Sequence, residues 1–249
     1  MKRIFFVFLT LCICCFVSAQ SKKIETFDKN TWHWTENADK FHSAIIEDGY
    51  LVISHSKFNK KATPYQRLAK SFVKLPLRPS ENFKLTVKYL VADYNLSWYS
   101  IYFNVDKDCM KDEGETGLFE KYQLFFAGST WALNVCPENR QVTEYATKES
   151  LKTIEFATRF GCFSANGATN FCIGKLPLKV ETRGEYPMEL VLLKRGKIVT
   201  IEVNDMQIFE GELKITKPYF GFQTPMFGKK VSYIKIDEVI VEQVDTDDD

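Results

Sequence analysis

Apolar and polar residues alternate with a period of two over much of the chain, and residues 188–213 (MELVLLKRGKIVTIEVNDMQIFEGEL) show this pattern best. Leu190 and Leu192 belong to a first apolar series, and a second series, rich in β-branched residues, follows it. This period and these residue types are typical of half-buried strands. Turn-forming residues at Arg195-Gly196 and Asn204-Asp205 separate the series. The stretch therefore predicts three antiparallel strands joined by two tight turns.

The same alternation predicts strands along the rest of the chain. Residues 83–91 alternate between apolar side chains and Lys or Thr, and residues 98–105 alternate between an apolar face and one that is both aromatic and polar. Turns are expected near Gly49 and Gly128, and an irregularity is expected at Asp237-Glu238 in the last strand. Only residues 143–160 suggest a helix, and poorly. These features indicate an all-β fold, a two-sheet antiparallel jelly-roll sandwich.

The first 19 residues have the organisation of a secretory signal peptide. Lys2 and Arg3 precede an apolar run over residues 4–17, which is shorter than the roughly 18 to 20 residues of a membrane span. No second long apolar run follows, so we expect no membrane span. A lipid anchor on a cysteine of this segment is the alternative, disfavoured because no small residue precedes any of them. We expect an exported protein, secreted, periplasmic or on the cell surface, in which residues 20–249 form one domain with a short acidic tail.

The charge of the chain is nearly balanced, with 33 Lys and Arg residues against 32 Asp and Glu residues. A protein that binds nucleic acid through its phosphates needs a basic excess or a basic stripe. The short basic groups at 57–61 and 229–230 are most simply solvated loops. We therefore expect no nucleic-acid partner.

Four cysteines remain after the predicted signal peptide: Cys109, Cys136, Cys162 and Cys172. An even number in an exported chain suggests two disulfides, and four cysteines allow three pairings. We favour Cys162–Cys172, which closes a short loop, with Cys109–Cys136 as the second bond. Free buried thiols are the alternative, while a zinc site is disfavoured because no close Cys-x-x-Cys or histidine spacing is present.

Several loose motifs resemble the concanavalin A-like lectin/glucanase superfamily. They are Phe27-Asp28-x-Asn30 with Trp34, Asp48-Gly49-Tyr50-Leu51, the hairpin over 194–204, and the closing segments at 220–222 and 236–241. The resemblance covers nearly the whole predicted mature chain. It implies two curved antiparallel sheets, with sugars bound on the concave sheet. It also implies a structural calcium ion where the first and last strands meet, for which Asp28 and Asp237 are the candidate ligands.

Sugar binding requires flat apolar rings that stack on pyranose faces, with amide or hydroxyl groups beside them. In an aromatic-rich chain, the simplest interpretation of any single ring is that it belongs to the core. The predicted strand 98–105 nevertheless carries amphipathic residues on the face opposite its apolar one, and the next predicted strands offer further candidates. The predicted ligand-binding residues are Trp98, Tyr102, Asn104, Gln123, Phe125 and Trp131.

A catalytic site is harder to assign. The resemblance implies a pattern to look for, since retaining glycosidases of this superfamily carry their acid and nucleophile on one strand, as in Glu-x-Asp-x-x-Glu. No predicted strand of the chain has such a pattern. Glu113 and Glu115 lie in a charged, glycine-containing loop, and the three histidines suggest no catalytic triad. The sequence thus favours a non-catalytic carbohydrate-binding protein. The alternatives are a glycoside hydrolase and an envelope-associated protein-interaction or structural module.

Overall fold

The computed structural model describes residues 21–38, 42–55, 68–92, 98–105, 121–128, 130–136, 169–176, 184–225 and 233–245. Within these ranges the chain forms β-strands and no helix. The strands are β1 (Lys22–Glu25), β2 (Asn37–Ala38), β3 (His42–Glu47), β4 (Tyr50–His55), β5 (Leu68–Lys74), β6 (Phe83–Val91), β7 (Trp98–Val105), β8 (Lys121–Ala127), β9 (Thr130–Cys136), β10 (Thr169–Lys175), β11 (Tyr186–Arg195), β12 (Ile198–Val203), β13 (Met206–Glu212), β14 (Tyr219–Pro225) and β15 (Tyr233–Gln243).

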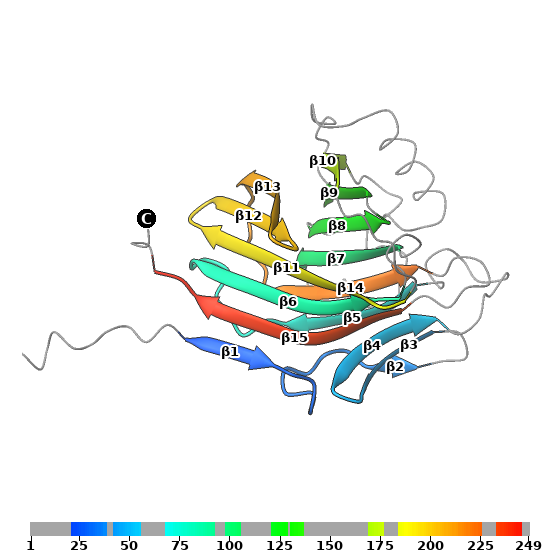
Figure 1. Cartoon of the computed structure of the whole chain (residues 1–249). Coiled ribbons are helices and arrows are strands. Elements are labelled where there is room, and N and C mark those ends of the chain that lie inside the picture. Colours follow the sequence, from blue (N-terminus) through cyan, green and yellow to red (C-terminus); the bar gives the residue numbers. More distant parts are fainter. Residues whose placement is uncertain are drawn as a thin grey trace, which may run out of the picture.

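The strands form two antiparallel sheets that stack as two layers (Figure 1). The nine-stranded sheet has the order β13-β12-β11-β6-β15-β4-β3-β2, and β1 pairs with the second half of β15. The six-stranded sheet has the order β10-β9-β8-β7-β14-β5. Strands far apart in the sequence, such as β6 and β15, lie side by side at the centre of the larger sheet. The predicted all-β, two-sheet antiparallel jelly roll is therefore confirmed.

The predicted three-strand meander is also confirmed, as β11, β12 and β13. The first turn lies one residue later than expected, at Gly196-Lys197, because Arg195 still pairs with Ile198. Gly196 takes a φ of 60°, and Asn204 and Asp205 take φ values of 48° and 61°. Positive φ at successive turn residues matches the right-handed twist of the flanking strands.

The hydrophobic core lies between the two sheets. Tyr89, Tyr99, Phe220 and Phe222 are nearly fully buried there, and Trp34 packs against both phenylalanines at ring-centroid distances of 6.4 Å. The hydroxyl groups of Tyr89 and Tyr99 lie 3.0 Å apart, so these two buried polar groups satisfy each other. The opposite face of the nine-stranded sheet carries charged pairs instead.

The irregularity expected at Asp237-Glu238 is confirmed, because the register of β15 against β6 shifts between Ile236 and Glu238. The shift places Glu238 opposite Lys88, whose ammonium lies 2.8 Å from Glu238 Oε1. This hydrogen bond raises the pKa of Lys88. Both side chains are partly exposed, so we expect the pair to contribute little to stability.

Some predictions fall on residues that the structure does not describe. Residues 1–19, Cys109 and Cys162 lie outside the described ranges, as do Glu113, Glu115 and the weak helix pattern at 143–160. The backbones of Cys136 and Cys172 lie on the neighbouring strands β9 and β10, but their side chains are not described. The signal peptide and both disulfides stay predictions. None of the described residues forms a helix long and apolar enough to cross a membrane.

Lys194 occupies the last core-facing position of β11, after Met188, Leu190 and Leu192. It is 5% exposed, and its ammonium donates a hydrogen bond to the Glu81 carbonyl at 3.0 Å. Burial lowers the pKa of Lys194 from its ordinary value of 10.5. Below the lowered pKa the folded chain must bury a charge, which costs stability. Between the two pKa values the unfolded chain binds more protons, so stability rises with pH.

Replacing Lys194 with methionine is expected to raise the free energy of unfolding by about 1 kcal/mol at pH 7, because the buried charge disappears while the apolar volume remains. The advantage over the wild-type protein should shrink as the pH approaches 10.5. Denaturant unfolding of both proteins at pH 7 and pH 10 measures this. Lys197→Met, at an exposed position of the adjacent turn, serves as the control. An advantage that grows with pH would contradict the prediction.

Candidate functional site

The candidate site is the face of the six-stranded sheet that points away from the core, called here the outer face. Alternation along the strands defines it. In β7, Tyr99, Ile101 and Phe103 join the core, so Ser100 and Tyr102 lie on the outer face. The same alternation in β8 places Gln123 and Phe125 there.

The register aligns these residues in rows across the sheet. One row crosses β5, β14, β7 and β8 and consists of Phe72, Gly221, Tyr102 and Gln123, and the backbone register continues it to Asn134 on β9 and Asn170 on β10. The next row consists of Lys70, Gln223, Ser100, Phe125, Ala132 and Ile173. The tertiary structure thus brings together aromatic and amide residues that are far apart in the sequence.

Gln123 links the two rows through hydrogen bonds. Its Nε2 donates to Ser100 Oγ at 2.8 Å and to Tyr102 OH at 3.0 Å. The Tyr102 ring lies 5.9 Å from the Phe72 ring, which extends over Gly221 on the strand between them. A polar group that is buried and fixed by hydrogen bonds keeps one orientation. Tyr102 and Gln123 therefore form a rigid part of this face.

Trp98 is the most accessible of the predicted aromatic residues. It is half-buried, whereas Tyr102, Gln123 and Phe125 are at most 4% exposed. The Trp98 ring meets the Phe125 ring at 6.0 Å with an interplanar angle of 85°, an edge-to-face contact. This contact fixes the indole from one side.

The structure places the two remaining predicted binding residues elsewhere. Trp131 belongs to the core and is 6% exposed, because it shares its face of β9 with Leu133. Asn104 lies at an irregularity between β7 and β14 with a φ of 57°. Its Oδ1 accepts backbone hydrogen bonds from Thr216 and Lys217, at 2.7 and 2.9 Å, and thereby holds the loop that leads into β14. Trp131 is therefore a core residue and not an outer-face residue. Asn104 has a structural role, because it holds the loop before β14.

The predicted calcium ligands lie near the paired first and last strands. Asp28 follows β1, Asp237 is the bulged residue of β15, and both are exposed. Asp28 Oδ2 accepts a hydrogen bond from the Thr26 hydroxyl at 3.1 Å. In the part of the chain that the structure describes, no group of three His, Cys, Asp or Glu side chains is arranged to hold a metal ion. The calcium site remains a prediction.

Sequence reasoning missed Glu25, the buried carboxylate beside this region. Glu25 is 2% exposed, and its Oε2 accepts hydrogen bonds from the Trp32 amide and the Thr31 hydroxyl, each at 2.7 Å. Its Oε1 accepts a longer one from the Phe27 amide. Glu25 thus holds together the loop that follows β1. A glutamate that follows two lysines and an isoleucine gives no sequence signal of such burial.

The six strands that form the outer face carry no acidic residue. The sequences of β5, β7, β8, β9, β10 and β14 contain neither Asp nor Glu. Lysines do occur in them, and Lys70 belongs to the same row as Phe125. On this face the strands therefore offer the half-buried Trp98 and Lys70 side chains, but no carboxylate for acid–base chemistry.

The sequence matches no protein-family model, and no curated protein matches it. Solved structures match its fold at low sequence identity. An endo-1,3-β-glucanase (laminarinase) catalytic domain from Thermotoga petrophila is 11% identical with a TM-score of 0.54, over 90% of this chain and 98% of that one. A structure from work on endo-acting O-glycanases, which human gut bacteria express to initiate mucin breakdown, is 12% identical with a TM-score of 0.55. The match covers 90% of this chain and 99% of that one.

A Bacillus subtilis protein of unknown function with a galectin-like fold also matches, at 13% identity and a TM-score of 0.54, over 90% of this chain and 98% of that one. Matches that cover both chains almost completely concern the fold as a whole. Together with the strand order given above, these matches show that the chain has the concanavalin A-like jelly-roll fold.

Proposed function

We propose that the protein binds glycans without cleaving them, through the outer face of the six-stranded sheet. The observation that carries this proposal is the half-buried Trp98 ring on this face, which packs against Phe125 beside the buried Tyr102 and Gln123, on strands without any acidic residue. Rings that stack on sugar faces, beside groups that hydrogen-bond hydroxyls, are the usual elements of a sugar site. The glycan-active neighbours of the same fold support the proposal.

The absence of acidic residues from these strands favours binding over hydrolysis. Glycosidases need two carboxyl groups, about 5–5.5 Å apart in retaining enzymes and about 6.5–9.5 Å apart in inverting ones. The described strands of the sheet provide neither member of such a pair. A hydrolase would therefore have to take both carboxylates from other segments.

Trp98 is the proposed stacking residue. Its half-exposed indole combines accessible apolar surface with an edge-to-face contact to Phe125 that limits its rotation. Tyr102 and Gln123 support it as a fixed layer below the surface. The predicted signal peptide would deliver the protein outside the cytoplasm, where polysaccharides are found.

Replacing Trp98 with alanine is expected to weaken glycan binding at least tenfold, because the stacking surface is lost. The probes are laminarin, mixed-linkage β-glucan and mucin O-glycans, chosen from the substrates of the structural neighbours. Affinity electrophoresis or calorimetry measures binding. The control is Tyr50→Ala, since Tyr50 is a half-buried aromatic residue of the other sheet. Equal binding by wild-type protein and Trp98→Ala would contradict the proposal.

An assay for new reducing ends on the same probes separates the alternatives. Release of oligosaccharides by the wild-type protein would favour a glycoside hydrolase. Binding to none of the glycans would instead favour a protein-interaction or structural module of the cell envelope.

A further inference from the structure

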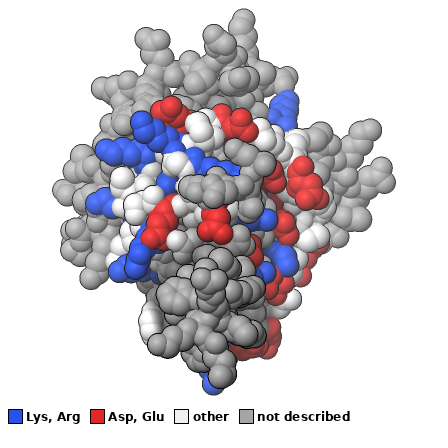
Figure 2. Space-filling view, turned by 90° about the vertical axis from the view of Figure 1, so that its left-hand side faces the viewer, with Lys and Arg blue, Asp and Glu red and all other residues white. Residues whose placement is uncertain are grey.

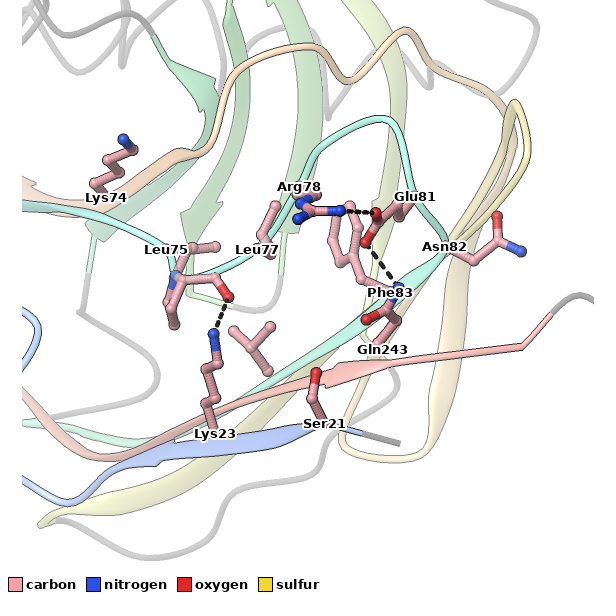
Figure 3. A pocket seen from close by; sticks show the side chains of 12 residues that line it. Ser21, Lys23, Lys74, Leu75, Leu77, Arg78, Glu81, Asn82, Phe83 and Gln243 are labelled. Carbon is pink, nitrogen blue, oxygen red and sulfur yellow. Dashed lines mark hydrogen bonds and ion pairs between the residues drawn. The ribbon is translucent and has the colours of Figure 1, made fainter. Parts of the chain in front are cut away.

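A pocket opens at the end of the sandwich where β1 and β15 lie beside the connection between β5 and β6. Its volume is about 450 Å³, within the range of small-molecule sites. Ser21, Lys23, Val241 and Gln243 line it from one side, and residues of the 75–82 connection line it from the other (Figure 3). None of the residues predicted for glycan binding belongs to this pocket.

The inner wall of the pocket is apolar. Leu75, Phe83 and Val241 are 4–5% exposed, so their side chains belong to the core, with only their edges reaching the pocket. Leu77 is partly buried and packs against the same core. Such a wall suits the apolar face of a small ring and disfavours a small inorganic ion, which would lose hydration there without gaining a polar contact.

Donor groups dominate the polar rim. The Glu81 carboxylate is already engaged, because Oε1 lies 3.0 Å from Arg78 Nη1 and Oε2 accepts a hydrogen bond from Gln243 Nε2 at 2.7 Å. The ammonium of Lys23 donates to the Pro76 carbonyl at 3.2 Å from the opposite side of the pocket (Figure 3). Arg78 and Lys23 have further N–H groups available for a ligand, and their two positive charges exceed the single negative charge of Glu81.

The surrounding surface also carries basic residues. Figure 2 faces the left-hand end of Figure 1, where β1 starts and β15 ends, and shows Lys and Arg side chains on this end together with acidic ones. The buried ammonium of Lys194 adds a positive charge near the pocket, because it donates a hydrogen bond to the backbone carbonyl of Glu81, a residue of the pocket rim. Positive potential at a concave site raises the local concentration of anions.

We propose that this pocket binds a sugar acid, a pyranose ring with one carboxylate. The carboxylate lies between Lys23 and Arg78, which make charge-assisted hydrogen bonds to it. One face of the ring covers Leu77 and Val241, and the hydroxyl groups meet Ser21 and the Gln243 amide. The requirement for both a ring and a negative charge follows from the apolar wall and the cationic rim together.

Calorimetric titration of the full protein with glucuronate tests this proposal, with glucose and acetate as probes that lack the charge or the ring. Glucuronate is expected to bind at least about tenfold more tightly than either, and more weakly as salt rises, because exposed charges are screened. Equal affinity for glucose or for acetate would overturn the proposal.

Two substitutions locate the site. Lys23→Gln and Arg78→Gln are each expected to weaken glucuronate binding about tenfold, since each removes a charge-assisted contact. The Arg78 side chain is 81% exposed, so its replacement leaves folding intact. Lys22→Gln is the matched control, because Lys22 precedes Lys23 in β1 but pairs with Glu242 instead. Equal weakening by Lys22→Gln, or none by the other two, would overturn the proposal.

The Trp98→Ala variant separates this site from the outer face. It is expected to bind glucuronate as tightly as the wild-type protein does, whatever its effect on polysaccharide binding. Loss of glucuronate binding in Trp98→Ala would place the anion on the outer face and overturn the pocket assignment.

Discussion

Replacing Gly221 with valine is expected to lower the free energy of unfolding by about 3 kcal/mol, because the position has no room for a side chain. A Cβ atom on Gly221 would lie 2.6 Å from both Cγ and Cε1 of Phe72 and closer still to Cδ1. Phe72 is 5% exposed and packs against Tyr102, so its ring can move only by giving up that contact. Denaturant unfolding measures the loss.

A double-mutant cycle identifies the cause. Phe72→Ala alone also destabilises the protein, because it empties the space above Gly221. If the two side chains compete for one volume, Gly221→Val combined with Phe72→Ala should cost at least about 1 kcal/mol less than the sum of the single changes. Simple additivity would show that strain in β14, rather than the Phe72 ring, explains the effect of the valine.

Gly221 also belongs to the candidate site. Phe72, Gly221 and Tyr102 form adjacent positions of one row, and the ring above the glycine reaches Tyr102 across the intervening strand. An aromatic ring that covers a glycine on the neighbouring strand is a known way to fix strand pairing. Gly221→Val should therefore weaken glycan binding as well, even though position 221 offers no side chain to a ligand.

Replacing Glu25 with alanine is expected to lower the free energy of unfolding by roughly 2–4 kcal/mol. Two short hydrogen bonds to the carboxylate are lost, and the Trp32 amide is left without this partner. Hydrogen bonds to charged groups contribute more than neutral ones, and an unsatisfied buried donor adds a further cost. Thermal or denaturant unfolding measures the effect.

Two comparisons sharpen the Glu25 experiment. Glu25→Gln keeps the shape and one acceptor oxygen, so its loss should be smaller than that of alanine. Glu242→Ala removes a carboxylate from the partner strand β15 that makes only a partly exposed ion pair with Lys22, at 3.3 Å, and should cost at most about 1 kcal/mol. Equal losses for Glu25→Ala and Glu242→Ala would contradict the structural role of the buried carboxylate.

The sheet face of some candidate residues could be predicted from the sequence, and that of others could not. The face of Trp98 and Tyr102 could be predicted, because alternation in residues 98–105 separates it from the apolar face. The same rule would have assigned Trp131 to the core with Leu133, since neighbours two apart share a face. Asn104 could not be assigned in this way, because the register shift at β14 interrupts the alternation just there.

The sequence by itself determined the strands, most of the turns and the two-layer class of the fold, because period-two alternation and turn residues act within a few positions of one another. Only the tertiary structure decided which residues meet: the rows that join Phe72, Tyr102 and Gln123, the burial of Glu25, and the pocket between Lys23 and Arg78. The rows and the pocket join segments separated by 20 to more than 100 positions in the sequence, whereas Glu25 is hydrogen-bonded locally, to Thr31 and Trp32, inside a loop that follows the paired strand β1. Strand order and register set them, and no local pattern along the chain records strand order.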